Sequence, residues 1–294
     1  MVCNASGCAM ATTSRLRDGR YRLDSCVSVE APPSEQKATI ASWLATDRSQ
    51  LGAIGTVLDV ADYQLMLVES PDVLAAELKA AVRWRLKDII DFPLEDAVVD
   101  VFGIPEPARR TGAKMMYAIA AKRQAIEEHI SIVKAVTPRF DVIDIPELAL
   151  RNLAAQLPEA ADGLILLWLN AQSAQLLVIK QSTLYLARTV QFTQNKGLSL
   201  RSEVPDVDAI ALELQRSTDY FESHYEQTPI SHLIIAPHNE HADMLAAELV
   251  NQTSMRIQTI DLSRALTVAP GVEAASRSSL LAIGAALRDD QIKL

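Results

Sequence analysis

Glycine spacing decides what phosphate chemistry this chain can do. Loops that cradle phosphates need backbone amides at close range and residues with φ above zero, which glycine supplies at little cost. The sequence has ten glycines, and only Gly52 and Gly55 lie within five residues of each other. No Walker loop and no GxGxxG motif is therefore present. The Gly52–Gly55 stretch precedes a predicted strand instead of joining a strand to a helix, so we interpret it as a turn.

Histidines and cysteines, the usual ligands of transition metals, are few and poorly spaced. His238 and His241 are three residues apart and would share one face of a helix, with His232 six residues before the first. A metal site also needs a third ligand and an ordered outer shell, and polar residues at a loop-to-helix junction are usually solvated. We therefore expect no metal. The three cysteines all lie in the first 30 residues without a CxxC pair, and we expect them to be reduced.

Composition excludes several function classes. The chain has 294 residues, enough for two cores of ordinary size. Its net charge is −9, whereas a general nucleic-acid surface needs clustered Lys and Arg. Hydrophobic residues make up 49% of the chain, yet no run approaches the roughly 20 apolar residues of a spanning helix. The first residues lack the basic and apolar pattern of a signal peptide, so we expect a cytoplasmic protein.

The elements that would position a site alternate between strands and helices. A first α/β unit is indicated by a hairpin signal at Asp18–Gly19, by near-continuous apolar strands and by amphipathic helices. Its strands are expected at 8–12, 20–29, 55–60, 64–68, 97–102, 115–121 and 140–145. Its helices are expected at 38–44, 74–90, 124–136 and 146–157.

The segment from residue 70 to 102 has the clearest local signals. Ser70 can cap a helix, and Pro71 suits the first helical position, where no N–H is needed. Apolar residues then recur at helical spacing, at Leu74, Leu78, Val82, Leu86 and Ile89 or Ile90. Pro93 is expected to end this helix, because the residue before a proline is pushed out of the α region. Trp84 lies off the centre of the apolar stripe, so we expect it to be partly exposed.

A second α/β unit follows a polar stretch at 158–163, which marks a boundary between two lobes. Its strands are expected at 164–169, 175–180, 183–191, 232–236 and 256–259, and its helices at 207–225, 242–251 and 276–287. A β-hairpin opens each lobe, which is a weak internal duplication. Periodicity by itself predicts two α/β units.

Five motifs carry a family resemblance. They are RWRLKD from Arg83 with DFP from Asp91, KMMYAIAAKRQAIEEHI from Lys114, DVIDIPELALRNL from Asp141, TLYLARTV from Thr183 and ELQRSTDYFESHY from Glu213. Together, over nearly the whole chain, they resemble the MshI family of mannose-sensitive haemagglutinin (MSHA) pilus biogenesis proteins. That family is similar to the cytoplasmic actin-like PilM and GspL proteins of type IV pilus and type II secretion assembly. The resemblance implies an actin-like α/β fold of two ribonuclease-H-type lobes, 1–157 and 158–294, with a small α/β subdomain inserted at 70–145.

Related actin-like proteins bind ATP between their lobes, and this chain departs from the motifs they use. Trp168 stands where the family has the acid of an Asp-hydrophobic-Gly turn that holds Mg²⁺ through water, and Asn170 ends that turn. Pro237 and His238 replace a glycine-rich run over the adenosine, and the first hairpin carries Asn4 but no acid. These loops read as degenerate nucleotide loops, so we expect no nucleotide cofactor and no catalysis.

The expected function is therefore a non-catalytic scaffold. The resemblance implies a protein peripheral at the inner membrane, which docks the cytoplasmic N-terminal tail of a PilN-like bitopic partner in a groove of the first lobe. Partner-binding residues are expected on the inserted segment, at Arg83, Trp84, Arg85, Asp88, Asp91 and Phe92. For Trp84 the alternative is a place at the edge of the core.

Two other functions stay open at this point. One is an ATP-binding switch or weak ATPase of the same fold. The other is a sugar- or acyl-phosphate kinase, for which Asp162 is the nearest candidate acid. The sequence also leaves open a homodimer and the choice between a pilus and a secretion system.

Overall fold

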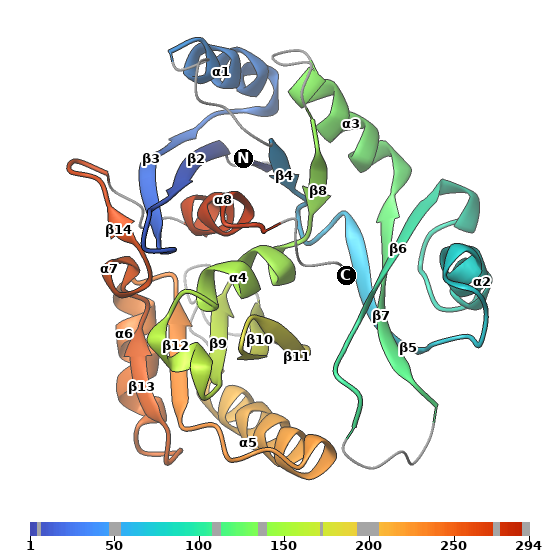
Figure 1. Ribbon diagram of the computed structural model, residues 1–294, viewed down its shortest axis with the longest axis vertical. Coiled ribbons are helices and arrows are strands. Elements are labelled where there is room, and N and C mark those ends of the chain that lie inside the picture. Colours follow the sequence, from blue (N-terminus) through green and yellow to red (C-terminus); the bar gives the residue numbers. More distant parts are fainter. Residues whose placement is uncertain are drawn as a thin grey trace, which may run out of the picture.

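The computed structural model describes residues 1–4, 7–46, 54–107, 113–134, 140–170, 173–192, 206–272 and 277–289. In these ranges the strands form three sheets of six, five and three strands. Figure 1 shows helices α4 (Pro146–Ala154) and α8 (Arg277–Ala286) between the first two sheets, with the third sheet to one side. A bilayer-spanning helix is not among the elements that the structure describes.

The first sheet contains the strands that open the chain. Its order is β14–β3–β2–β1–β4–β8, and β1, β2 and β3 form an antiparallel meander. The bounds are Val2–Asn4 for β1, Gly7–Arg15 for β2, Tyr21–Glu30 for β3, Gly55–Val57 for β4, Val142–Asp144 for β8 and Thr267–Val268 for β14. The turn predicted at Asp18–Gly19 is confirmed, with Gly19 at φ 87°. Helices α1 (Pro33–Thr46) and α3 (Arg123–Lys134) cover one face, where Ile40 and Val133 are buried.

The second sheet repeats this arrangement in the order β11–β10–β9–β12–β13. Strands β9, β10 and β11 form the meander, and β12 runs parallel to β9 as β4 runs parallel to β1. The bounds are Leu164–Leu169 for β9, Ser173–Lys180 for β10, Thr183–Gln191 for β11, His232–Ala236 for β12 and Arg256–Thr259 for β13. All residues of β9 are buried, because α4 covers one face of the sheet while α5 (Val207–Tyr225) and α6 (Glu240–Leu249) cover the other.

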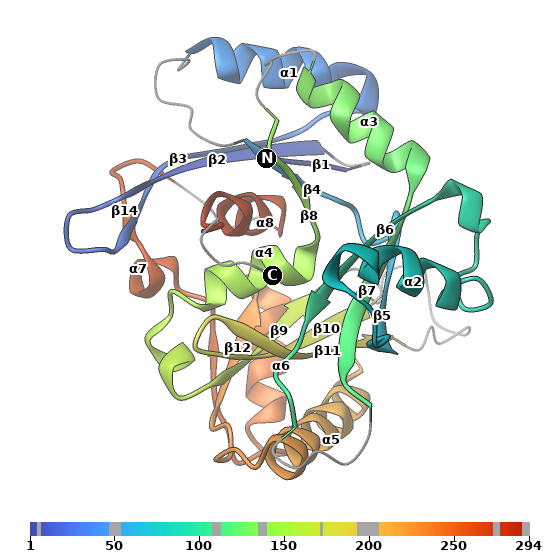
Figure 2. The same cartoon turned by 45° about the vertical axis from the view of Figure 1, so that its right-hand side comes forward.

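The third sheet is the inserted subdomain, in which β5 and β6 pair antiparallel with β7 between them. The bounds are Tyr63–Glu69 for β5, Ala97–Gly103 for β6 and Met115–Lys122 for β7. Side chains alternate along β6: Val99 and Val101 pack under helix α2 (Leu78–Arg85), whereas Phe102 joins the core of the first lobe. Figure 2 shows α2 on the outer side of this sheet, so the opposite face looks toward the first sheet.

The start predicted for the helix at 74–90 was wrong. Ser70 does not cap it, because the Ser70 N–H donates to the Lys114 carbonyl at 2.6 Å and extends the pairing of β5 with β7. Ser70 and Pro71 lie outside any helix, a 3₁₀ turn spans Ala75–Glu77, and α2 follows that turn. Leu74, which was expected on the buried stripe, is consequently 73% exposed.

The predicted end of the same helix was also wrong. Helix α2 ends at Arg85, well before Pro93, so the proline is not what ends it. The Arg83 guanidinium donates to the carbonyls of Leu94 and Ala97, the latter at 2.6 Å. These bonds hold the segment before β6 against α2.

The end of the chain returns to the first sheet. Strand β14 pairs in parallel with β3, and α8 packs against α4 and β2. A Cβ on Gly284 of α8 would lie 2.1 Å from the Ala149 carbonyl oxygen of α4, so these helices meet backbone to backbone. The domain bounds 1–157 and 158–294 stay a prediction, but packing places β14 and α8 with the first sheet.

Candidate functional site

Asn4 was assigned to a degenerate nucleotide loop, and its polar groups are used within the chain. Its Oδ1 accepts from the Gly7 N–H at 3.1 Å, and its Nδ2 donates to Ser278 Oγ at 3.2 Å. Its carbonyl accepts from Gln36 Nε2 at 2.7 Å. Asn4 thus ties the first hairpin to α1 and α8, while residues 5–6 of this loop lie outside the described residues.

Trp168 and Asn170 form a local pair at the end of β9. Trp168 is 1% exposed and packs in the core between the two large sheets. Its indole Nε1 donates to Asn170 Oδ1 at 3.0 Å, which satisfies the polar end of a buried tryptophan. An indole has a donor and no acceptor, so Trp168 supplies no metal ligand.

Pro237 and His238 lie between β12 and α6. His238 Nε2 is 3.4 Å from Asp243 Oδ2, and both side chains are 57% exposed. Asn239 caps α6 by accepting from the Ala242 N–H at 2.9 Å. The described part of the chain contains no group of three or more His, Cys, Asp or Glu side chains able to hold a metal ion.

A mainly apolar groove lies between the inserted sheet and the first sheet, and it encloses about 240 Å³. Strands β6 and β7 supply one wall and β8 the other, while α3 and α4 each add an apolar side chain. We call it the docking groove, and its lining includes Val98, Phe102, Ile126, Ile143, Leu148 and Arg288. The alternation along β6 places Val98 and Phe102 on the groove side.

Two strand edges border the docking groove. Strand β6 is the last strand of the inserted sheet, and β8 is the last strand of the first sheet. An edge strand presents backbone N–H and C=O groups to which an extended segment can add. The groove therefore combines a surface for backbone pairing with an apolar space for side chains.

Both acidic side chains that line the docking groove have a basic partner. Arg288 Nη1 is 3.0 Å from Asp144 Oδ2, and the Asp144 side chain is 2% exposed. Burial raises the pKa of Asp144, and the Arg288 guanidinium opposes that shift. Asp100 lies 2.6 Å from Lys79 Nζ. Because these charges are balanced, the groove offers a ligand mostly apolar contact.

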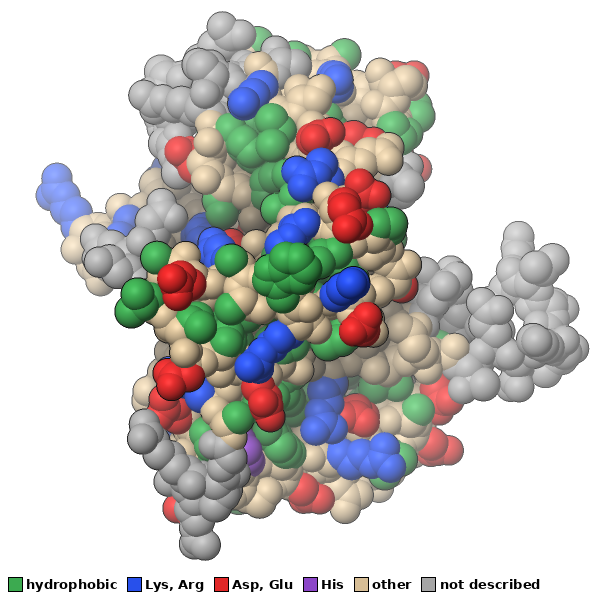
Figure 3. Space-filling view, turned by 90° about the vertical axis from the view of Figure 1, so that its right-hand side faces the viewer, with side chains coloured by type: hydrophobic (Ala, Val, Ile, Leu, Met, Phe, Trp, Pro, Cys, Tyr) green, Lys and Arg blue, Asp and Glu red, His purple; other side chains and the backbone are tan. Residues whose placement is uncertain are grey.

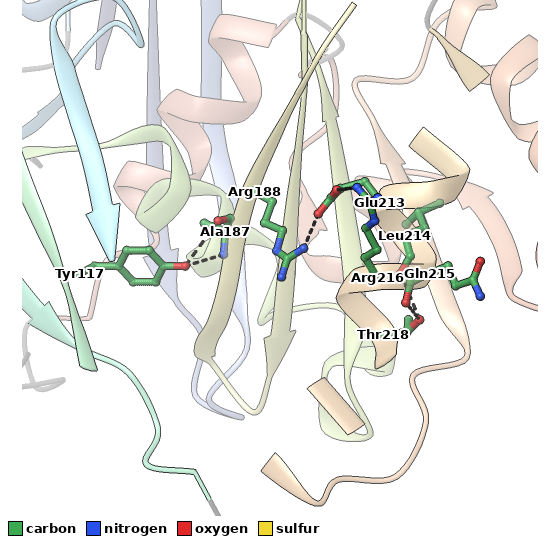
Figure 4. A network of polar contacts seen from close by, with 8 residues as sticks. All are labelled: Tyr117, Ala187, Arg188, Glu213, Leu214, Gln215, Arg216 and Thr218. Atoms are coloured by element: carbon green, nitrogen blue, oxygen red, sulfur yellow. Dashed lines mark hydrogen bonds and ion pairs between the residues drawn. The ribbon is translucent and has the colours of Figure 1, made fainter. Parts of the chain in front are cut away.

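The inner face of the inserted sheet also contacts the second sheet (Figure 4). The Tyr117 hydroxyl on β7 accepts from the Ala187 N–H at 2.8 Å and donates to the Ala187 carbonyl at 3.4 Å. Burial raises the pKa of Tyr117 to about 12, so the hydroxyl stays protonated at neutral pH. Ala187 lies on β11, an edge strand, and its neighbour Arg188 pairs with Glu213 of α5 at 2.5 Å.

Glu147, at the start of α4, links the inserted sheet to the second sheet. Its carboxylate accepts from the Tyr63 hydroxyl at 2.5 Å and from Gln175 Nε2 at 3.0 Å. The residue is 4% exposed, and this burial raises its pKa. A cavity of about 340 Å³, lined by β5, β10 and β11, lies beside these contacts.

Glu147→Gln should remove a pH-dependent loss of stability. The folded-state pKa of Glu147 is raised, so its protonated form favours folding, and that stability is lost as the pH rises through the folded value. An amide cannot ionise, so the melting temperature of the variant relative to wild type should increase from acidic to neutral pH. Thermal unfolding followed by circular dichroism measures this difference, and a difference independent of pH would contradict the assignment.

The residues expected to bind the partner lie on the outer side of the inserted sheet, the side that Figure 3 faces. They are Arg83, Trp84, Arg85, Asp88, Asp91 and Phe92. Trp84 is 72% exposed, as expected, but Arg85 donates to the Glu69 carbonyl at 3.0 Å and Phe92 packs under α2. None of these six residues lines the groove described above, because α2 lies on the opposite face of the inserted sheet. Their binding of a partner stays a prediction.

Sequence reasoning missed the groove residues Phe102, Ile143 and Leu148. A signal for Phe102 was present, because both alternating sets of side chains on the strand at 97–102 contain apolar residues, which is typical of a strand covered on both faces. Local sequence patterns do not indicate that the edges of β6 and β8 lie opposite each other, so they could not predict the groove.

Comparison with solved structures supports the fold. The chain matches a chain of the "PilM-PilN type IV pilus biogenesis complex" with a TM-score of 0.69 and 18% identity, covering 97% of this chain and 96% of that one. It matches the cytoplasmic domain of EpsL, an inner membrane component of the type II secretion system of Vibrio cholerae, with a TM-score of 0.48 and 14% identity over 95% and 94% of the two chains. No protein-family model matches the sequence, and no curated protein matches it. At 18% identity the first match establishes only the fold. The second match is too weak to support a conclusion.

The fold is actin-like, as the resemblance in the sequence implied. Two sheets with equivalent strand order enclose α4 and α8, and a small subdomain is inserted beside them. The groove described above lies between the inserted subdomain and the first sheet of this fold.

Proposed function

We propose that this chain is a non-catalytic actin-like scaffold of an MSHA-type (type IV) pilus assembly complex at the inner membrane. In this role it lies in the cytoplasm and docks the N-terminal tail of a PilN-like bitopic membrane protein. The observation that carries the proposal is an apolar groove of about 240 Å³ bordered by the edges of β6 and β8. The likeness to a chain of a PilM–PilN complex supports this class of partner.

The groove suits an extended tail better than a folded domain. A strand edge gives a tail backbone hydrogen bonds, and alternate side chains of the tail then enter the apolar space. The nearby charges already have partners within the chain, in the pairs Asp144–Arg288 and Asp100–Lys79. Affinity should therefore depend on apolar tail residues and change little with salt.

Hydrogen exchange with a synthetic peptide of a PilN-like N-terminal tail tests the docking site. We expect the peptide to slow exchange in β6 and in the segment from β8 into α4, since these elements line the groove. Raising the salt concentration should leave the dissociation constant nearly unchanged. Protection confined to the second sheet, or to α2 alone, would overturn the proposed site.

We also propose that the cleft between the lobes does not bind Mg·ATP. Trp168 is buried in the core where the family has an acid, and Asn4 is bound to Gln36 and Ser278. Isothermal titration should give no dissociation constant below about a millimolar, which is roughly 4 kcal/mol of affinity. The tail peptide, titrated in the same way, is the positive control.

Thermal unfolding provides a second test of nucleotide binding. A ligand present at about 100 times its dissociation constant adds about 2.7 kcal/mol of stability, so bound Mg·ATP would raise the melting temperature clearly. We expect no such rise. A rise would favour the alternative function, an ATP-binding switch or weak ATPase of the same fold.

A further inference from the structure

Tyr117 gives β11 the backbone hydrogen bonds that a neighbouring strand would otherwise supply. Its hydroxyl bonds both backbone groups of Ala187, the N–H at 2.8 Å and the carbonyl at 3.4 Å, as Figure 4 shows. Strand β11 is at the edge of the second sheet, where such backbone groups need a partner once they are buried. A side chain of the inserted sheet thus completes the hydrogen bonding of another sheet.

The same ring supports a wall of the docking groove. Phe102 stacks on Tyr117, with ring centroids 5.2 Å apart and 30° between the planes. Phe102 is 4% exposed and lines the groove. Tyr117 is therefore in direct contact with a groove residue through its ring and with the second sheet through its hydroxyl.

The space around this contact is open. A cavity of about 340 Å³ is lined by Tyr63 and Leu65 of the inserted sheet and by Ala187 and Arg188 of β11. The two sheets are therefore not packed continuously here. Arg188 is fixed from the other side by Glu213, at 2.5 Å, so β11 is held between α5 and Tyr117 (Figure 4).

We propose that Tyr117 is a positioning residue that couples the docking groove to β11. It holds the Phe102 ring in place for the tail, and a shift of that ring on tail binding changes the bond to Ala187. This inference rests on the proposed function for the identity of the ligand, but the coupling of β6 to β11 is a property of the chain alone. We expect tail binding to strengthen the bond between Tyr117 and Ala187. Because coupling is reciprocal, loss of that bond must then weaken tail binding.

The first experiment uses the chain without a tail. Tyr117→Phe keeps the stacked ring and removes only the hydroxyl, and exchange should become faster both in β11 and in β6. Tyr225→Phe is the matched control, because Tyr225 also donates to a β11 carbonyl, that of Tyr185 at 3.4 Å, but lies wholly within the second lobe. Unchanged exchange in β6 of Tyr117→Phe, or an equal change in Tyr225→Phe, would overturn the coupling.

A second variant approaches the contact from the groove. Phe102→Leu removes the stacking and leaves the Tyr117 hydroxyl, and it should also speed exchange of the Ala187 amide. A Phe102→Leu effect limited to β6 would refute the coupling, even if Tyr117→Phe proved too unstable to use.

The last experiment adds the synthetic tail peptide. In wild type we expect slower exchange at the groove together with a change in β11. In Tyr117→Phe the groove should still be protected, the dissociation constant should rise about fivefold, and the β11 response should vanish. A β11 response that persists in Tyr117→Phe would overturn the inference. A wild-type chain without any groove protection would overturn the proposed function instead, while the tail-free result still decides the coupling.

Discussion

Val98→Asp should abolish tail binding while leaving the protein folded. Val98 is half-buried on the groove side of β6, so a carboxylate there faces apolar tail side chains in the complex but can be hydrated in the free protein. Arg288, which lines the groove, is already paired with Asp144. We expect a loss of about 2 kcal/mol or more, about thirtyfold in dissociation constant. Fluorescence anisotropy of a labelled tail peptide measures it.

Two matched variants separate the docking groove from the outer face of the inserted subdomain. Val73→Asp makes the same substitution at a site that is 42% exposed outside the groove. Trp84→Ala removes the exposed tryptophan of α2. Both should keep the wild-type melting temperature, and Val73→Asp should also keep the wild-type affinity. If Trp84→Ala no longer binds the tail peptide while Val98→Asp still binds it, the partner docks on α2, as the sequence analysis predicted.

Gly284→Ala should strongly destabilise the fold. An added Cβ would lie 2.1 Å from the Ala149 carbonyl oxygen and 2.6 Å from its carbon, so α8 and α4 would have to move apart. The contact is backbone to backbone, and Asn152 Nδ2 also bonds the Gly284 carbonyl at 3.1 Å. Overpacking of this kind costs about 3 kcal/mol or more, which lowers the melting temperature by on the order of 10 °C.

Gly103→Ala is the control for that prediction. Gly103 ends β6, and a Cβ built there meets no atom within 4 Å. The same substitution should therefore change the melting temperature little. A loss of stability at Gly284 no larger than at Gly103 would show that α4 and α8 do not pack as closely as described.

Most elements could be predicted because their signals lie in consecutive residues. Helix α5 spans Val207–Tyr225 as expected, and Ile210, Leu214, Phe221 and Tyr225, which are spaced by four or seven residues, are all buried. The apolar run Leu164–Leu169 forms the central strand β9, since a strand covered on both faces needs no polar side. The strand pattern also predicted the β-hairpins β2–β3 of the first sheet and β10–β11 of the second.

The parts that could not be predicted depend on segments far apart in the chain. Helix α2 is shorter than its helical spacing predicts, and the flanking chain makes contacts with distant residues, Ser70 with Lys114 and Ala97 with Arg83. The docking groove exists because the edges of β6 and β8 lie opposite each other, which no local pattern encodes. Among the candidate site residues, the sequence analysis assigned Trp168 and Asn170 to the same loop. Only the structure shows that their side chains are hydrogen-bonded to each other.

The return of α8 to the first sheet sets the order in which the chain can fold while it is being synthesised. The second sheet and its outer helices come from one continuous stretch, residues 164–259, which can close once it has left the ribosome. All strands of the first sheet except β14 are made earlier, yet Ala9 and Val57 lack the packing of α8 until residues 277–286 emerge. The N-terminal half therefore keeps an apolar face open until the last helix is made.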